Sequence, residues 1–217
     1  MKKFQLLRKI LNSGIVAIVR TETTEKAIKT VEAIKAGGIS VIEVTMTVPN
    51  AIDAIKNLVD YCGKEDIILG VGSVLDPETA RIAILAGAEY VVTPNVNTDV
   101  IKLCNRYQVP IMPGAMTIKE IIEAMEAGAD IVKVFPGEML GPAFIKAVRG
   151  PLPQAPLMPT GGVSLDNIKN WFDAGAVAVG IGGSLTEGAK QGNYQLVTDT
   201  ARRFVEKIQL FRRGVEL

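Results

Sequence analysis

The 217-residue chain contains no histidine. This absence excludes a Ser-His-Asp triad, a Cys-His nucleophile and a histidine proton shuttle. It also excludes most of the common catalytic zinc and non-haem iron sites, which depend on imidazole ligands. Any acid–base or nucleophilic chemistry must therefore come from lysine, glutamate, aspartate, tyrosine, cysteine, serine or threonine.

Cysteine, aromatic residues and net charge are scarce as well. Cys62 and Cys104 form no CxxC motif and suggest no disulfide framework, which favours reduced thiols that fill the core of a cytoplasmic protein. Aromatic residues make up 5% of a chain that is 48% hydrophobic, so the core is aliphatic. A net charge of +1 argues against a nucleic-acid partner, whose phosphates need a basic excess.

Long apolar runs are missing too. No segment approaches the roughly 20 apolar residues that cross a membrane, so no membrane partner is expected. At the N-terminus, Phe4, Leu7 and Leu11 fall at positions i, i+3 and i+7, which predicts an amphipathic helix over Met1–Asn12 and not a signal peptide. No Pro- or Ser-rich linker interrupts the chain, and we predict a single domain over residues 1–217.

Short β-branched segments alternate with helical patterns along the chain. We predict strands at Ile15–Val19, Ser40–Thr45, Ile67–Gly72, Glu89–Thr93, Val109–Met112, Asp130–Phe135, Ala155–Pro159 and Ala176–Ile181. The helical patterns include Thr24–Ala36, Asn50–Tyr61, Pro77–Ala86, Thr117–Ala127, Ser164–Ala174 and Tyr194–Phe211. The strands are mostly continuous apolar runs, as expected when both faces are covered.

Eight such units predict an α/β fold of the (β/α)8 or TIM barrel type, with the first helix as an N-terminal addition. A repeat supports the barrel, because an Ala-Gly pair closes a helix before the second, fourth, sixth and eighth strands. Glycine just past a helix end adopts the left-handed conformation at low cost. A doubly wound sheet is the alternative, but the first turn has no Gly-rich fingerprint.

Lys133 is the only lysine embedded in an apolar strand. By strand alternation it shares a face with Ile131 and Phe135. If that face points into the barrel, desolvation lowers the pKa of the amine and frees a nucleophile that forms a Schiff base with a carbonyl substrate. In the alternative interpretation the stem packs and the ammonium reaches the rim.

Glu43 is the clearest acid in a strand interior. Glu89 and Asp130 also fall in predicted strands, but at their starts, where a structural role at the opposite end of the barrel is expected. Two lone charges that face one interior are costly unless they are paired or used. Glu43 is therefore either a general acid–base beside Lys133 or half of a buried structural ion pair.

Three further features follow strand ends, where barrel enzymes carry their sites. Arg20 ends the first strand and could bind a carboxylate through two parallel hydrogen bonds, although an ordinary exposed arginine is the alternative. Glycine-rich turns at Gly161-Gly162 and at Gly182-Gly183-Ser184 follow the last two strands. Small residues let backbone N–H groups approach an anion, so these turns predict a phosphate site.

Taken in order, these segments resemble one known family across nearly the whole chain. The matching motifs are Ile15–Arg20, Glu43-Val44-Thr45, Gly70–Val74, Val92-Thr93-Pro94, Met112-Pro113-Gly114, Lys133–Glu138, Pro159–Val163 and Gly180–Ser184. The chain resembles the class I aldolases that cleave 2-keto-3-deoxy-6-phosphogluconate (KDPG) and 2-keto-4-hydroxyglutarate (KHG).

The resemblance implies roles for individual residues. Lys133 matches the Schiff-base lysine and Glu43 the general acid–base. The resemblance also implies substrate-binding positions at Arg20, Ser73, Thr160, Thr47 and Pro94, and phosphate-binding positions at Gly161, Gly162, Gly182, Gly183 and Ser184. Some members carry an arginine for the carboxylate where this chain has Thr47, and others place it at the end of the first strand, as Arg20 is. A homotrimer with no metal and no cofactor is implied as well.

The expected reaction is cleavage of a 2-keto acid, phosphorylated in the case of KDPG, to pyruvate and an aldehyde. The aldehyde is glyceraldehyde 3-phosphate from KDPG or glyoxylate from KHG. Cleavage of the galactonate epimer and a non-catalytic sugar-phosphate-binding trimer are the alternatives. The absent histidines disfavour a metal-dependent epimerase on the same barrel, and Asp130 and Lys133 lack the second acid of a Lys–Asp decarboxylase network.

Overall fold

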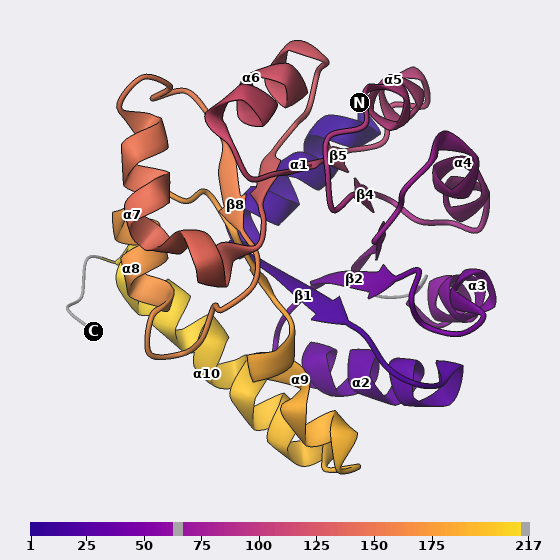
Figure 1. Ribbon diagram of the computed structural model, residues 1–217. Helices are drawn as coiled ribbons and strands as arrows, with labels where there is room; N and C mark the ends of the chain where they lie inside the picture. The colour runs from indigo at the N-terminus through magenta and orange to yellow at the C-terminus, as the bar shows by residue number, and fades with distance from the viewer. Residues whose placement is uncertain (63–66, 214–217) are drawn as a thin grey trace.

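Parallel strands surround a common axis, and helices form an outer ring around them (Figure 1). The computed structural model describes residues 1–62 and 67–213. Its strands are β1 (Ile15–Val19), β2 (Val41–Thr45), β3 (Ile68–Gly72), β4 (Val91–Val92), β5 (Ile111–Met112), β6 (Gly114–Ala115), β7 (Val132–Val134), β8 (Leu157–Pro159) and β9 (Val179–Ile181). This is the TIM barrel architecture expected from the sequence.

The barrel closes through two hydrogen-bonded sheets. One has the order β5-β4-β3-β2-β1-β9 and the other the order β6-β7-β8. The N–H of Val177 donates to the carbonyl of Leu157 at 2.9 Å, and Thr160 bridges to Gly180, so β8 and β9 are joined. Pro113 separates β5 from β6, and its carbonyl accepts the N–H of Lys133 at 2.9 Å. The predicted fifth strand therefore continues to Ala115, with a break at Pro113, where proline offers no N–H.

The helices follow the strands in alternation. They are α1 (Lys2–Ser13), α2 (Thr24–Ala36), α3 (Ala51–Cys62), α4 (Pro77–Leu85), α5 (Thr98–Arg106), α6 (Ile118–Glu126), α7 (Gly137–Arg149), α8 (Ile168–Asp173), α9 (Gly183–Lys190) and α10 (Tyr194–Arg212). Thr117 and Glu120 form the predicted capping box of α6, and Asp76 caps α4. The Ala-Gly repeats behave as expected, with positive φ at Gly38, Gly87, Gly128 and Gly175.

Helix α8 begins later than predicted. The sequence pattern favoured a start at Ser164, whereas the helix begins at Ile168. The side chain of Asn167 accepts the N–H of Ser164 at 2.9 Å and donates to the carbonyl of Gly162 at 2.7 Å. These bonds hold the segment as a turn against the preceding glycines, because asparagine offers the backbone an alternative to the helix.

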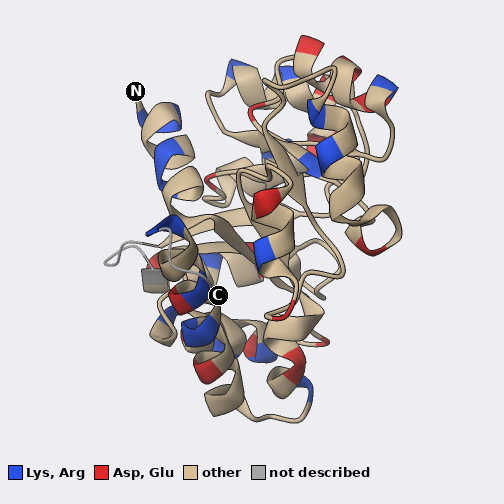
Figure 2. Ribbon diagram, turned by 90° about the vertical axis from the view of Figure 1, so that its left-hand side faces the viewer, with Lys and Arg blue, Asp and Glu red and all other residues tan. Residues whose placement is uncertain are grey.

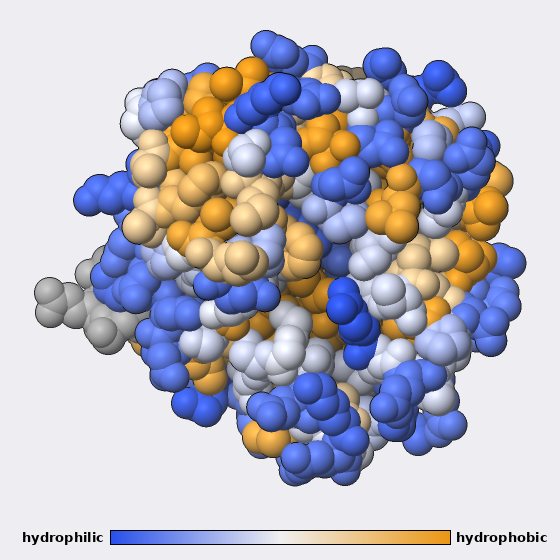
Figure 3. Space-filling model, in the orientation of Figure 1, coloured by the Kyte–Doolittle hydropathy of each residue, from blue (hydrophilic) through white to orange (hydrophobic). Residues whose placement is uncertain are grey.

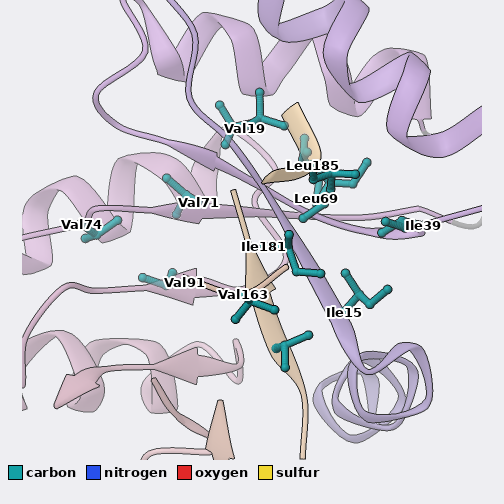
Figure 4. Packing of buried hydrophobic residues seen from close by; sticks show 14 of the residues in the cluster. Ile15, Val19, Ile39, Leu69, Val71, Val74, Val91, Val163, Ile181 and Leu185 are labelled. Atoms are coloured by element: carbon teal, nitrogen blue, oxygen red, sulfur yellow. The ribbon is translucent and has the colours of Figure 1, made fainter. Parts of the chain in front are cut away.

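Alternation along the strands divides the core into two clusters. Inside the barrel lie residues such as Val41, Tyr90 and Ile131. Their neighbours on the opposite face, for example Val71 and Ile181, pack toward the outer helices (Figure 4). Lys133 shares parity with Ile131 and Glu43 with Val41, so both charged side chains face the interior.

Helix α1 closes the N-terminal end of the barrel. Leu6 and Ile10 join the interior cluster and are 7% and 0% exposed. Beside them, Lys3 pairs with Asp130 at 2.9 Å, and both side chains are nearly buried. Lys2 pairs with Glu89 at 3.0 Å. The two acids at strand starts thus bind the N-terminal helix, as the structural interpretation of these residues predicts.

The outer surface carries both signs of charge. Figure 2 shows lysine, arginine, aspartate and glutamate interspersed over the outer helices. Pairs one helical turn apart, such as Lys29 with Glu25 at 2.7 Å and Lys169 with Asp173 at 2.7 Å, account for part of this pattern. No helix in residues 1–62 or 67–213 is long and apolar enough to cross a membrane.

Replacement of Ile10 tests how much the first helix contributes to stability. We expect Ile10→Ala to lower the free energy of unfolding by about 2–5 kcal/mol, because it leaves a cavity against the interior cluster. Leu11→Ala is the matched control, since Leu11 is 39% exposed. Urea denaturation followed by circular dichroism measures both, and equal losses for the two variants would contradict the proposed closure of the barrel by α1.

Candidate active site

Two charged side chains lie inside the upper part of the barrel. Glu43 on β2 is 1% exposed and Lys133 on β7 is 6% exposed. The Lys133 Nζ lies 4.9 Å from the centroid of the Phe135 ring, the next residue on the same face. Both side chains come from regular strands, so the backbone hydrogen bonds of the barrel fix their positions.

Glycines on neighbouring strands make room for these side chains. A methyl group at Gly72 on β3 would overlap the carboxyl of Glu43, and one at Gly180 on β9 would overlap the hydroxyl of Thr160. Any larger residue would therefore displace a polar group of the interior. The glycines at these strand positions are a steric requirement of the site.

The electrostatics of Glu43 depend on its burial. Neither carboxyl oxygen has a hydrogen-bond partner among the described residues. Burial raises the pKa of Glu43, while the nearby charges of Lys133 and Arg20 oppose the increase. Glu43 therefore holds its proton to a higher pH than an exposed glutamate, as suits a group that both takes and gives a proton.

A cavity of about 480 Å³ opens above the carboxyl ends of the strands. It brings together seven of the predicted site residues. They are Arg20, Thr160, Gly161, Gly162, Gly182, Gly183 and Ser184. The cavity therefore unites the end of the first strand with both glycine-rich turns.

The glycine turns of this cavity have the backbone geometry that a close approach needs. Gly161 and Gly162 have φ values of +97° and +70°, which L side chains rarely adopt. Gly183 begins α9, and nothing lies within 4 Å of a methyl group placed there. The Ser184 hydroxyl donates to the carbonyl of Val163 at 2.6 Å and ties the two turns together. The surface between them combines a helix N-terminus with glycine backbone, a combination that favours anions.

Three predicted substrate-binding residues lie away from this cavity. Thr47 lines a second cavity of about 380 Å³, which shares Arg20 with the first. The Thr47 hydroxyl lies 2.8 Å from that of Thr45. Ser73 follows β3 with a φ of +58° and does not line either cavity. Pro94 follows β4, with its carbonyl against Gly114, and is likewise not among the lining residues.

Several lining residues were not predicted from the sequence. Phe135 and Lys190 line the first cavity, and Lys190 also lines the second. Phe135 carried a usable signal, because it stands two residues after Lys133 on the same face of the strand. Lys190 carried none, since it looks like any exposed lysine at a helix end.

The cysteine thiols were expected to be inert. Cys104 on α5 is buried, and burial raises its pKa to about 12. Its thiol is protonated at neutral pH and is not a nucleophile. The side chain of Cys62 lies outside the described residues. Among the residues that the structure describes, no group of three or more Asp, Glu, Cys or His side chains could hold a metal ion.

A buried lysine and a buried glutamate in a parallel barrel, with a cavity at the carboxyl ends of the strands, are the features of a lysine-dependent barrel enzyme. The comparisons give the family. The family model for "KDPG and KHG aldolase" matches residues 7–200. The chain belongs to the KDPG and KHG aldolase family, and it is a lyase of the class I aldolase type.

Individual relatives agree with this assignment. The 2-dehydro-3-deoxy-6-phosphogalactonate aldolase of Escherichia coli K12 is 32% identical over 203 residues, which span 93% of this chain and 96% of the relative. The KHG/KDPG aldolase of the same strain is 32% identical over 93% of this chain and 95% of its own. The crystal structure of the KDPG aldolase from Legionella pneumophila holds pyruvate as a covalent carbinolamine. It superposes with a TM-score of 0.81 at 28% identity over 88% of this chain and 93% of that chain.

Replacement of Gly72 tests the space reserved for Glu43. We expect Gly72→Ala to reduce aldol cleavage by about 10²-fold, because Glu43 is the predicted acid–base and a small displacement of such a group is costly. The added methyl group would overlap the carboxyl. Gly150→Ala at the end of α7 is the control, with only the Ala147 carbonyl at 3.2 Å from the new atom. Release of pyruvate, measured with lactate dehydrogenase, gives the rates, and parental activity in Gly72→Ala would show that Glu43 needs no such space.

Proposed function

We propose that the protein cleaves KDPG to pyruvate and glyceraldehyde 3-phosphate through a Schiff base on Lys133. The observation that carries the proposal is the burial of Lys133 and Glu43 on one interior, beneath a cavity bordered by Arg20 and two glycine turns. KHG, which lacks the phosphate, is a second substrate of the same site and yields pyruvate and glyoxylate.

The covalent steps use the two buried groups. The Lys133 amine attacks the C2 ketone and forms a carbinolamine, which loses water to give an iminium ion. Glu43 transfers the protons of this step. The Glu43 carboxylate then takes the C4 hydroxyl proton, the C3–C4 bond breaks toward the iminium, and the aldehyde leaves. The remaining enamine takes a proton at C3 from Glu43, and hydrolysis releases pyruvate and the free amine.

The anionic ends of the substrate match the two sides of the cavity. Arg20 borders both cavities and influences Glu43, so its guanidinium suits the carboxylate next to the reacting ketone. The phosphate binds at the N-terminus of α9 and the backbone of Gly161 and Gly162. Thr160 lines the cavity between them, and its buried hydroxyl has no hydrogen-bond partner among the described residues, so it suits a polar group of the substrate.

The galactonate epimer of KDPG is the alternative substrate. The E. coli relative named for the phosphogalactonate reaction covers as much of this chain as the KHG/KDPG relative, at the same 32% identity. The two sugar acids differ in the configuration of one hydroxyl, and the same steps cleave both. A sugar-phosphate-binding protein without catalysis is disfavoured, because it has no need of a buried lysine and a buried acid.

We also propose that the protein assembles as a homotrimer. Apolar side chains are exposed on and beside helices α4, α6 and α7. They are Leu75, Ile82, Leu85, Met116, Ile118, Ile122 and Met139. Figure 3 shows apolar surface over the edge formed by α6 and α7. Exposed apolar patches of this kind mark contacts between proteins, and a second copy of the chain suits the proposed assembly.

Replacement of Lys133 tests the covalent mechanism. We expect Lys133→Ala to abolish turnover, because the amine is the nucleophile. Borohydride added with pyruvate should increase the mass of the parent by one reduced adduct and leave the variant unmodified. Lys102→Ala is the control lysine for labelling, since Lys102 is exposed on α5 and lines neither cavity. Adduct formation at another lysine in Lys133→Ala, located by peptide mapping, would overturn the assignment.

A charge placed in the phosphate site tests the preferred substrate. Gly183 has free space around it, so Gly183→Asp should fold normally and repel a phosphate. We expect kcat/KM for KDPG to fall about tenfold or more, since each 1.4 kcal/mol of lost binding is tenfold. The value for KHG should stay within about twofold of the parent.

Gly183→Asn supplies the same shape without the charge. Parallel assays of KDPG, its galactonate epimer and KHG rank the three substrates for the parent. Equal losses for KDPG and KHG in Gly183→Asp would contradict a phosphate site at this turn.

A further inference from the structure

Tyr90 is a buried polar residue to which the proposed mechanism gives no role. It stands one residue before β4, is fully buried and belongs to the interior cluster of the barrel. Its hydroxyl has no hydrogen-bond partner among the described residues. A buried, unbonded hydroxyl costs free energy, and phenylalanine would fill the same volume without that cost. The hydroxyl therefore needs an explanation in this fold.

The Tyr90 ring lies against the middle of β3. Its Cζ and both Cε atoms lie against Gly70 on β3, where a methyl group would overlap them. The Glu43 carboxyl lies in the same way against Gly72, the next interior position of that strand. Gly70 is also the register partner of Glu43 across the β2–β3 pair. The phenol from β4 and the carboxyl from β2 therefore meet over one glycine strip, defined by Gly70 and Gly72.

The groups that influence Glu43 lie on or beside three other strands. Lys133 on β7 and Arg20 after β1 are cations, and Tyr90 before β4 is the remaining titratable group. Burial raises the pKa of Tyr90 well above its ordinary value, and the charges of Glu43 and then Glu89 raise it further. The phenol therefore keeps its proton at neutral pH, where it is available as a hydrogen-bond donor.

We propose that Tyr90 is a positioning residue whose hydroxyl donates to one bridging water molecule, which in turn donates a hydrogen bond to the Glu43 carboxylate over the glycine strip. The inference rests on the proposed role of Glu43 in proton transfer. Donation to the charged form of an acid favours that form, so Tyr90 opposes the effect of burial on Glu43. One bridging water molecule thereby gives a hydrogen-bond partner to both polar groups.

The test measures proton transfer at Glu43 without aldol cleavage. Pyruvate forms the iminium on Lys133, Glu43 removes a methyl proton to give the enamine, and a deuteron from D2O returns. Proton NMR follows this exchange as a function of pD in the parent and in Tyr90→Phe. We expect the acidic limb of the profile to move up by about one unit in the variant, because a hydrogen bond to a charged group is worth about one pKa unit or more.

Two measurements separate positioning from packing. Borohydride trapping of pyruvate at Lys133 should stay within about twofold of the parent, since the nucleophile is unchanged. Incorporation of 3-fluorotyrosine at position 90 makes the phenol a stronger donor and should move the limb to lower pD. That protein retains the ring and serves if Tyr90→Phe does not fold. Tyr107→Phe is the matched control, because Tyr107 is 41% exposed.

The outcomes are distinct. A Tyr90→Phe profile that superimposes on the parent profile, together with higher thermal stability, overturns the proposal and makes the phenol a packing group. An unchanged profile with 3-fluorotyrosine does the same. If the parent neither exchanges pyruvate protons nor traps pyruvate, the proposed function itself fails, and the role of Tyr90 fails with it.

Discussion

The fold has to hold two opposite charges inside an apolar barrel. Lys133 and Glu43 are buried, and neither carboxyl oxygen of Glu43 is hydrogen-bonded within the described residues. Such burial is expensive unless the environment compensates it. The positive charges of Lys133 and Arg20 supply this compensation. They stabilise the charged carboxylate and so oppose the increase in the pKa of Glu43 that burial causes. Gly72 leaves the space that the Glu43 carboxyl occupies. The packing of the barrel and the electrostatics of the site are therefore coupled.

The two ends of the barrel differ in how they treat the interior: one is closed and the other is open. At the N-terminal end, Ile10 of α1 covers the interior of the barrel. The ion pair between Lys3 and Asp130, whose charged atoms are 2.9 Å apart, lies beside it. At the C-terminal end, glycine turns and Arg20 leave the interior open to an anion. A sealed base keeps water away from the buried charges, and an open top admits substrate. This polarity explains why acids at strand starts are structural while charges farther along the strands belong to the site.

Strand alternation made the central pair predictable from the sequence. Lys133 shares a face with Ile131 and Glu43 with Val41, and the structure places all four inside the barrel. Capping signals and the Ala-Gly repeats fixed the helix ends for the same reason, because they are local in the chain. The break at Pro113 and the late start of α8 were not predicted, because they depend on bonds to neighbouring segments.

The surroundings of the pair could not be predicted in the same way. A glycine in a strand indicates that space is needed, but it does not say which side chain fills the space. Gly70 and Gly72 accommodate the Tyr90 ring and the Glu43 carboxyl respectively, and only the packing of β2, β3 and β4 reveals this. Thr47 was assigned by resemblance alone, and it lines the second cavity together with Arg20.

The absence of histidine explains why the surroundings of Glu43 matter. An acid–base group works best when its pKa lies near the working pH, and imidazole has such a pKa without help. The pKa of a glutamate must be raised to reach that range, and burial has this effect on Glu43. Burial alone would leave the carboxyl protonated and unable to accept a proton. The cations Lys133 and Arg20, and the proposed donor Tyr90, therefore balance the desolvation, and the chemistry of the site depends on that balance.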